Sequence, residues 1–126
     1  MGKTIAGLIE EDGEIAISAG VDAFDDGKNP FPVFKNISEC DVKADVVIDF
    51  SVAAAMDGLL SWCMEKEIPC VLCTTGLSDE QLEMVKKLSE KTAVLKSANM
   101  SLGINMLMKL LKEAAHVLAA ADFDIE

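Results

Sequence analysis

The chain has 126 residues, of which 51% are hydrophobic, and a net charge of −11 at pH 7. A chain of this length and composition forms one domain with a hydrophobic core, and its apolar content argues against disorder. The net negative charge and the scattered lysines argue against a nucleic-acid partner. No apolar run is long enough to span a membrane, and the N-terminus has no signal-peptide core. These features together predict a cytoplasmic protein.

Helix-like and strand-like apolar patterns alternate along the first half of the chain. The elements expected there, in chain order, are a helix over 3–11, a strand over 15–21, a loop-rich segment over 23–38, a strand over 45–50 and a helix over 53–65. The loop-rich assignment reflects glycine and proline in a stretch with little periodicity.

The same alternation continues through the second half. Pro69 opens a strand that ends near Thr74, and the spacing of Ser78 and Gln81 predicts a capping box at the start of a helix. That helix is expected to bury Leu82, Val85 and Leu88. The remaining expected elements are a strand over 92–96, a helix over 102–118 with Met106, Leu110, Ala114 and Val117 or Leu118 inward, and the first residues of a strand over 123–126.

Strands that alternate with helices predict an α/β fold with a doubly wound parallel sheet. The pattern begins with a helix, whereas in a Rossmann sheet the first strand is central and lies between the second and the fourth. We therefore expect a Rossmann-type sheet without its first strand, with unpaired backbone groups on the strands beside the gap.

Four cysteines include Cys70 and Cys73, which have the spacing of some zinc and redox motifs. Both lie in an apolar strand, where residues three apart point to opposite faces and cannot share a metal. We interpret them as buried structural cysteines and predict no metal site. His116 lies among alanine and leucine in the last predicted helix and is interpreted as structural or surface rather than catalytic.

Small and polar residues follow the apolar runs of three predicted strands. The segments are Asp49-Phe50-Ser51, Thr74-Thr75-Gly76 and Ser97-Ala98-Asn99-Met100. Ligands of open α/β sheets bind outside the carboxyl ends of the strands, and backbone donors beside apolar side chains suit a nucleotide. Asp22 ends an earlier strand about twenty positions after Gly2, the spacing expected between a glycine turn and a ribose-binding acid.

A phospho-accepting receiver domain is the alternative from a different class. Three successive strand ends carry Asp49, Thr74 or Thr75, and Lys96. In a receiver, an aspartate nucleophile, a hydroxyl and a lysine at these places would bind phosphate. A receiver also needs an acidic pair after its first strand to hold Mg²⁺, but Asp25-Asp26 follow a later strand. Ser97 replaces the proline usual after the lysine, which further disfavours this interpretation.

Several segments resemble dihydrodipicolinate reductase, also called 4-hydroxy-tetrahydrodipicolinate reductase: Val46–Ser51, Val71–Gln81 and Ser97–Ala115. The segment over 122–126 resembles the strand that enters the family's substrate domain. The resemblance runs in order over nearly the whole chain. It implies a Rossmann-type cofactor domain over 1–121, incomplete at its N-terminus, followed by the start of a strand into a missing substrate domain.

The resemblance implies contacts with a nicotinamide dinucleotide. Met1-Gly2 resembles the end of the family's glycine-rich phosphate loop, and Asp22 falls at the acidic position that binds the adenosine ribose. The other implied cofactor contacts are Phe50, Cys73, Thr74 and Thr75, with Cys73 where the family usually has glycine, and Ser97, Ala98, Asn99 and Met100 near the nicotinamide. Ala23 replaces the basic residue of members that use NADPH readily, so of NADH and NADPH we expect NADH to be preferred.

The activity implied by the resemblance is hydride transfer from NAD(P)H to hydroxy-tetrahydrodipicolinate with loss of water, giving tetrahydrodipicolinate in the diaminopimelate route to lysine. The family's first strand, most of its glycine loop, its general acid and its substrate-anion loop have no counterpart in the sequence. No catalytic residue is therefore assigned, and the chain alone is expected to be inactive. The partners implied are the small-molecule substrate and further copies in a homo-oligomer.

Overall fold

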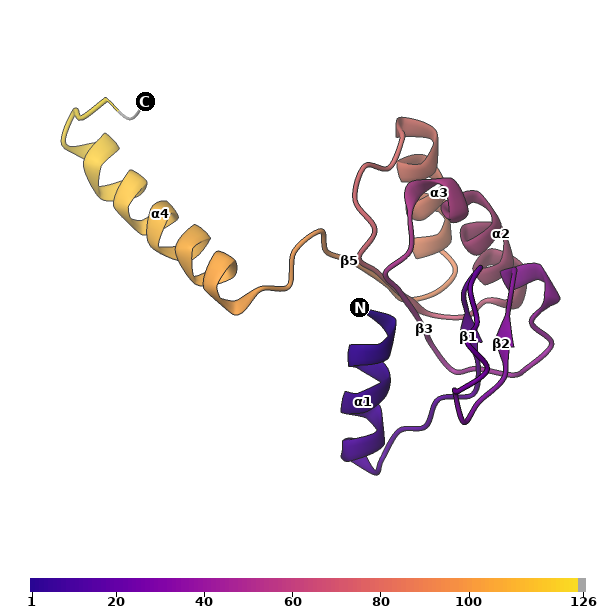
Figure 1. Cartoon of the computed structure of the whole chain (residues 1–126). Coiled ribbons are helices and arrows are strands. Elements are labelled where there is room, and N and C mark those ends of the chain that lie inside the picture. Colours follow the sequence, from indigo (N-terminus) through magenta and orange to yellow (C-terminus); the bar gives the residue numbers. More distant parts are fainter. Residues whose placement is uncertain (125–126) are drawn as a thin grey trace. The chain divides into compact units, whose positions relative to one another are not determined.

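A computed structural model of the chain describes residues 1–124. The chain divides into two compact units, Met1–Lys96 and the segment that begins at Ser97, and each is described by itself. Figure 1 shows the elements in chain order, from indigo at the N-terminus to yellow in the last helix. Within the described residues, no helix is both long and apolar enough to cross a bilayer.

The helix predicted over 3–11 is confirmed as α1, Gly2–Asp12. It ends at Gly13, whose φ of 73° lies in the left-handed region that glycine adopts at little steric cost. The sequence signal for this end, a glycine directly after the last helical residue, is local, which explains why the prediction succeeded.

The first sheet pairs two short parallel strands, β1 (Gly20–Val21) and β2 (Val33–Phe34). The Asp22 N–H extends this pairing by donating to the Phe34 carbonyl at 3.0 Å. The prediction of a strand over 15–21 is therefore correct only at its end, because β2 is too short to pair with the residues that precede Gly20.

The loop-rich segment over 23–38 contains more structure than predicted, namely β2 and the 3-10 helix η1, Ile37–Glu39. The prediction missed β2 because Pro32 precedes it and proline interrupts strand patterns. Pro32 nevertheless contributes to the pairing of β1 with β2, because its carbonyl accepts a hydrogen bond from the Gly20 N–H at 2.9 Å.

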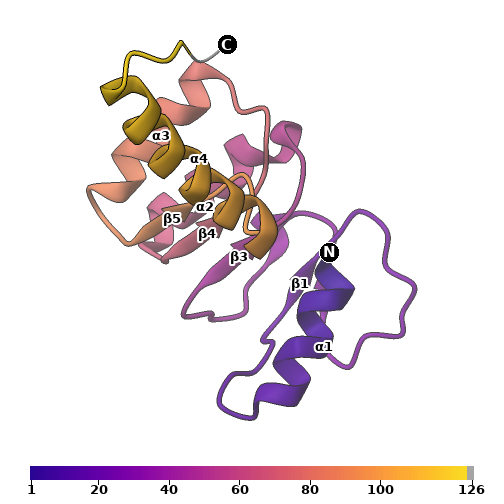
Figure 2. The ribbon, with the colours of Figure 1, turned by 90° about the vertical axis from the view of Figure 1, so that its left-hand side faces the viewer.

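The second sheet has three parallel strands in the order β3-β4-β5, which lie side by side in Figure 2. Their bounds are Val47–Asp49, Cys70–Leu72 and Val94–Lys96. All three lie where the sequence predicts strands, and each is shorter than predicted. The register aligns Ile48, Val71 and Leu95 in one row, so their side chains point to the same face.

The hydrophobic core joins this sheet to two helices, α2 (Met56–Lys66) and α3 (Asp79–Ser89). The helix predicted over 53–65 is confirmed as α2, except that its first turn is the 3-10 helix η2, Ala53–Ala55. The buried core side chains are Met56, Leu59, Leu60, Trp62, Cys63, Cys70, Leu72, Val85 and Leu88. The row on the opposite face is open, with Ile48 44% and Leu95 56% exposed.

The capping box predicted at the start of α3 is confirmed. Ser78 Oγ accepts from the Gln81 N–H at 3.3 Å, and Gln81 Oε1 accepts from the Ser78 N–H at 3.1 Å. Val85 and Leu88 are buried as predicted, but Leu82 is 40% exposed, so that part of the prediction is wrong. The face that packs inward is the one shared by Gln81, Val85 and Leu88, which recur at the i, i+4, i+7 spacing of a helix.

The two sheets are separate: within residues 1–124, β1 pairs only with β2, and β3 pairs only with β4 on one side. In a Rossmann sheet the strand order is 3-2-1-4-5-6, so the second and fourth strands flank the first. We equate β1 and β2 with Rossmann strands two and three, and β3, β4 and β5 with Rossmann strands four, five and six. The gap between the two sheets then falls where Rossmann strand one would lie. The α/β class with parallel, Rossmann-type strands is thus confirmed.

The second unit consists mainly of α4, Leu102–Ala120, which confirms the helix predicted over 102–118. Within its own unit none of its residues is buried, so the inward face of Met106, Leu110, Ala114 and Val117 or Leu118 stays a prediction. A single helix has no second apolar surface within its own unit to pack against. Of the strand predicted over 123–126, Phe123 and Asp124 have no regular structure, and 125–126 lie outside the described residues.

Candidate functional site

The carboxyl ends of β3 and β4 are neighbours in the sheet, because Asp49 lies opposite Leu72 in the register. Each strand is followed by a short loop, 50–52 after β3 and 73–77 after β4. We call these the strand-end loops. They lie on the sheet edge at which open α/β folds bind ligands.

A buried hydrogen bond joins the bases of the strand-end loops. Thr74 Oγ1 donates to Asp49 Oδ2 at 2.7 Å, and the two residues are 4% and 5% exposed. The Ser51 N–H donates to the other carboxylate oxygen of Asp49 at 2.9 Å, and the Cys73 N–H donates to the Asp49 carbonyl at 3.0 Å. Asp49 therefore forms hydrogen bonds with residues of both loops.

A second polar contact joins the helical segments that follow the two loops, α3 on one side and η2 with α2 on the other. Gln81 Nε2 donates to the Ala53 carbonyl at 2.9 Å and to Asp57 Oδ1 at 3.0 Å. From the sequence, Gln81 is only a capping residue. The signal that could have revealed this second role is the amide itself, since a Glu at this position would complete the capping box equally well but could not donate.

The predicted cofactor contacts at these loops divide into exposed and buried residues. Phe50 is 38% exposed and Thr75 is exposed, whereas Cys73 and Thr74 are buried. Gly76 turns the second loop with a φ of 72°, and no atom lies within 4 Å of where its Cβ would be. Thr75 and Phe50 thus present side chains at the surface, whereas the Thr74 side chain is turned inward to Asp49.

All four cysteines are free thiols, and three of them are buried: Cys63 in α2, Cys70 in β4 and Cys73 directly after β4. Cys70 belongs to the hydrophobic core together with Cys63, and their contact raises the pKa of the Cys63 thiol and lowers that of Cys70. Burial and the nearby Asp49 carboxylate raise the pKa of the Cys73 thiol. The interpretation of Cys70 and Cys73 as buried cysteines is confirmed.

The raised pKa of Cys73 predicts slow alkylation. At pH 8 we expect iodoacetamide to modify Cys73 at least about tenfold more slowly than the half-buried Cys40, because the thiolate is the reactive species. Mass spectrometry of peptides after timed quenching measures both rates. Asp49→Asn removes the negative charge and is expected to accelerate alkylation of Cys73 but not of Cys40. Equal rates in the unaltered chain would contradict the prediction.

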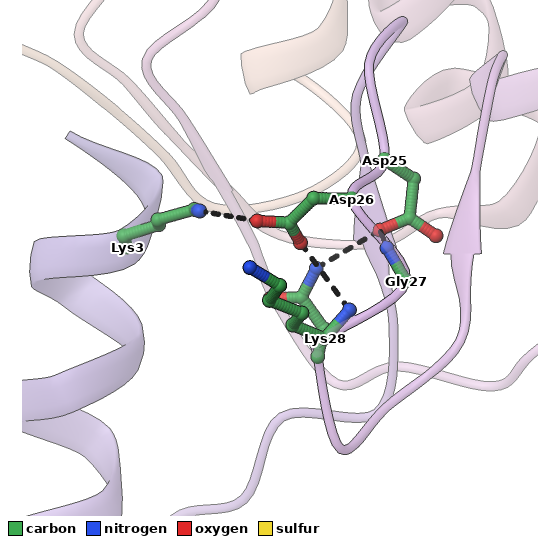
Figure 3. A network of polar contacts seen from close by, with 6 residues as sticks. Lys3, Asp25, Asp26, Gly27 and Lys28 are labelled. Carbon is green, nitrogen blue, oxygen red and sulfur yellow. Dashed lines mark hydrogen bonds and ion pairs between the residues drawn. The ribbon is translucent and has the colours of Figure 1, made fainter.

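The predicted adenosine end lies at the start of α1 and the loop after β1 (Figure 3). Lys3 Nζ forms an ion pair with Asp26 Oδ2 at 2.9 Å, and Asp26 Oδ1 accepts from the Lys28 N–H at 3.2 Å. Hydrogen bonding to Asp26, with further attraction from Asp22 and Asp25, raises the pKa of Lys3, and the same hydrogen bond lowers the pKa of Asp26. The structure therefore brings α1 and the Asp22 loop together.

Asp22 itself is exposed, and its Oδ1 accepts from the Phe24 N–H at 2.9 Å. This bond uses one carboxylate oxygen and leaves Oδ2 available to hydroxyl donors. Met1 precedes α1 as its N-cap without a side-chain cap, and no atom lies within 4 Å of a Cβ placed on Gly2. The three predicted residues are thus all accessible.

The segment Ser97–Met100 belongs to the second unit and has its own hydrogen bonds. Asn99 Oδ1 accepts from the Ser101 N–H at 2.8 Å, and Ser97 Oγ donates to the Asn99 carbonyl at 3.2 Å. Asn105 Nδ2 donates to the Ser101 carbonyl at 2.8 Å. These contacts connect the segment to the first turns of α4.

Two shallow surface hollows lie away from these strand ends. They are lined by Trp62 and Lys66 of α2 and by residues around Cys40 and Asp41, which precede β3. Shallow hollows at the amino ends of strands lie at the wrong edge of an α/β sheet for the expected ligand. We therefore give them no part in the site.

Comparison with known proteins decides between the reductase and the receiver interpretations. The family model described as dihydrodipicolinate reductase, N-terminus, matches residues 1–100. The chain belongs to the dihydrodipicolinate reductase family. The resemblance stated from the strand-end motifs is thus confirmed, and the receiver alternative built on Asp49, Thr74 and Lys96 is set aside. Asp49 is also unsuited to act as a phosphate nucleophile, since it is buried and both its carboxylate oxygens accept hydrogen bonds.

Curated relatives in this family carry the name 4-hydroxy-tetrahydrodipicolinate reductase. The protein from Clostridium novyi is 45% identical over 126 residues, which are 100% of this chain and 50% of the relative. The protein from Clostridium tetani is 44% identical over 100% of this chain and 49% of its own length. The protein from Alkaliphilus oremlandii is 42% identical over 94% of this chain and 45% of its own length. The chain spans about half the length of the curated relatives it matches.

Proposed function

We propose that the chain is the NAD(P)H-binding part of a 4-hydroxy-tetrahydrodipicolinate reductase. One observation carries the proposal: the two strand-end loops are joined by the buried Asp49–Thr74 hydrogen bond on the edge of the sheet where such folds bind ligands. Family membership supplies the ligand class. Residues 1–121 form the cofactor domain in this proposal, and Asp122 begins the connection to a substrate domain.

In the proposed complex, the two ends of the cofactor contact different residues. The phosphates lie against Met1-Gly2 at the start of α1, where backbone N–H groups and the helix dipole favour anions. The free Oδ2 of Asp22 accepts from the adenosine ribose. Phe50 and Thr75 contact the cofactor from the exposed side of the strand-end loops, supported by the buried Cys73 and Thr74. Ser97, Ala98, Asn99 and Met100 line the nicotinamide end.

The reaction proposed for the complete enzyme is hydride transfer from the reduced nicotinamide to hydroxy-tetrahydrodipicolinate with loss of water, giving tetrahydrodipicolinate for lysine synthesis. We assign no catalytic residue to this chain and expect no turnover from it alone. We place the enzyme in the cytoplasm, since free buried thiols suit a reducing compartment. A homo-oligomer is its proposed state.

Titration with NADH tests the proposal. We expect NADH to shift the amide resonances of Asp22, Phe50 and Thr75 in ¹H–¹⁵N spectra, and we expect Asp22→Ala to weaken binding about tenfold by removing the ribose acceptor. Asp41→Ala, an exposed aspartate before β3, is the matched control and should bind like the unaltered chain. Absence of NADH-dependent shifts would refute the proposed function.

We also propose that NADH is preferred over NADPH. Near the ribose position, the carboxylates of Asp22, Asp25 and Asp26 outnumber the two lysines, Lys3 and Lys28, and Lys3 already pairs with Asp26. An added 2′-phosphate would meet net negative charge there.

Asp26→Asn should release Lys3 and remove one negative charge. We expect this variant to raise the affinity for NADPH several-fold while changing that for NADH little, because only NADPH carries the extra phosphate. Parallel titrations with the two cofactors measure the ratio, and Glu10→Gln, an exposed acid on the last turns of α1, provides the charge-matched control. An unchanged ratio in Asp26→Asn would contradict the prediction.

A further inference from the structure

Asp49 is a buried carboxylate whose side-chain hydrogen bonds, among residues 1–124, go to the strand-end loops. Its two carboxylate oxygens accept from the Thr74 hydroxyl and the Ser51 N–H, and its carbonyl accepts from the Cys73 N–H. Burial of a charge is costly unless hydrogen bonds replace the lost water, and here one residue satisfies donors from both loops. No lysine forms an ion pair with Asp49 among the described residues.

The bond to Asp49 also determines which groups remain for a ligand. Because the Thr74 hydroxyl gives its proton to Asp49, Thr74 Oγ1 offers only lone pairs on its other side. The Ser51 N–H points to Asp49 and is likewise occupied. Within residues 1–124, the N–H groups of Thr75 and Gly76 donate to no protein acceptor, so they remain available as donors at the exposed turn.

We infer that Asp49 is a positioning residue for the cofactor: through Thr74 it holds the Thr75–Gly76 turn so that its free N–H groups face an acceptor oxygen of the nicotinamide half. This inference rests on the proposed function and adds to it a residue that itself makes no contact with the cofactor. The pair is separated by 25 positions in sequence, so only the parallel register of β3 and β4 brings it together.

Two substitutions break the pair in different ways. Thr74→Val keeps the side-chain shape but leaves Asp49 Oδ2 without its donor. Asp49→Asn removes the charge and replaces one of the two acceptor oxygens by an amide donor, so the present bonds from the Ser51 N–H and the Thr74 hydroxyl cannot both persist. Thr74→Ser retains the hydroxyl and should rescue the function. Asp45→Asn and Thr92→Val make the same chemical changes two residues before β3 and β5, on the side of the sheet away from the strand-end loops, and Val85→Ala lowers stability through the core alone.

Three measurements separate positioning from general stability. For each variant of the full 126-residue chain we would record the NADH dissociation constant, the melting temperature, and amide hydrogen exchange at Ser51 and Cys73, whose N–H groups are bonded to Asp49. We expect Thr74→Val and Asp49→Asn to weaken NADH binding about tenfold and to accelerate exchange at both amides. Thr74→Ser should restore most of the NADH affinity that Thr74→Val loses, and Asp45→Asn and Thr92→Val should bind NADH like the unaltered chain.

The outcomes distinguish the inference from the function on which it rests. If Thr74→Val and Asp49→Asn accelerate exchange but leave NADH affinity unchanged, the pair does not position the cofactor and the inference is overturned while the proposed function stands. If Val85→Ala, with an equal fall in melting temperature, weakens binding as much, the effect is one of stability and the inference is again overturned. If the unaltered chain shows no NADH binding, the proposed function fails and the inference fails with it.

Discussion

Leu88→Ala is expected to lower the free energy of unfolding by about 2–5 kcal/mol, the usual range for truncating a leucine in a packed core. Leu88 is fully buried in α3 and packs in the core formed with α2 and β4. The second sheet has only three strands of three residues each, so little other apolar surface compensates for the cavity. A loss of this size is a large part of the total stability of a small domain.

Urea unfolding followed by fluorescence of Trp62, which is buried beside this core, measures the loss. Leu82→Ala is the matched control, because it makes the same truncation in the same helix at a residue that is 40% exposed. We expect it to cost less than about 1 kcal/mol, since little apolar area returns to water and alanine favours helix. Equal losses at the two positions would contradict the described packing of α3.

Gln81→Glu is expected to destabilise the chain by about 2–3 kcal/mol, although glutamate is a good capping-box residue. The Oε1 contact to the Ser78 N–H can persist in this variant. The Nε2 donor is lost, however, and a carboxylate oxygen would then face the Ala53 carbonyl and the Asp57 carboxylate. Repulsion in a largely buried place adds to the loss of two hydrogen bonds.

Two further measurements identify the cause. The like charge of Asp57 should raise the pKa of the introduced carboxyl, so the penalty relative to the unaltered chain should shrink as the pH falls and the new group is protonated. In the double variant that adds Asp57→Asn to Gln81→Glu, the new amide can donate to the introduced carboxylate, and part of the stability should return. A neutral Gln81→Glu would show that Gln81 acts only as a cap.

The sequence predicts the helices and strands of this chain well where the signals are local. The capping box at Ser78, the glycine that ends α1 and the short apolar runs of β3, β4 and β5 each lie within a few residues, and each is confirmed. The strand-end motifs also sufficed to identify the family, whose model matches residues 1–100.

The errors share a different cause. Leu82 fits an apolar pattern, but the face of α3 that packs inward depends on where α2 lies, and Gln81 occupies that face instead. The apolar stripe of α4 predicts a buried side that stays a prediction, because a stripe does not specify what covers it. Pro32 hid β2 from the pattern, and the partner strand that stabilises β2, β1, lies more than ten residues earlier in the chain.

By itself, the sequence determined the α/β class, the places of the strands, and Asp22, Phe50, Thr74 and Thr75 as candidate ligand residues. Only the tertiary structure decided that Thr74 is buried and bonded to Asp49, that Gln81 joins α3 to η2 and α2, and that Lys3 pairs with Asp26. The physical reason is distance along the chain. Helix caps and apolar periodicity are written within one or two turns, whereas these contacts join residues more than twenty positions apart and depend on how strands and helices pack.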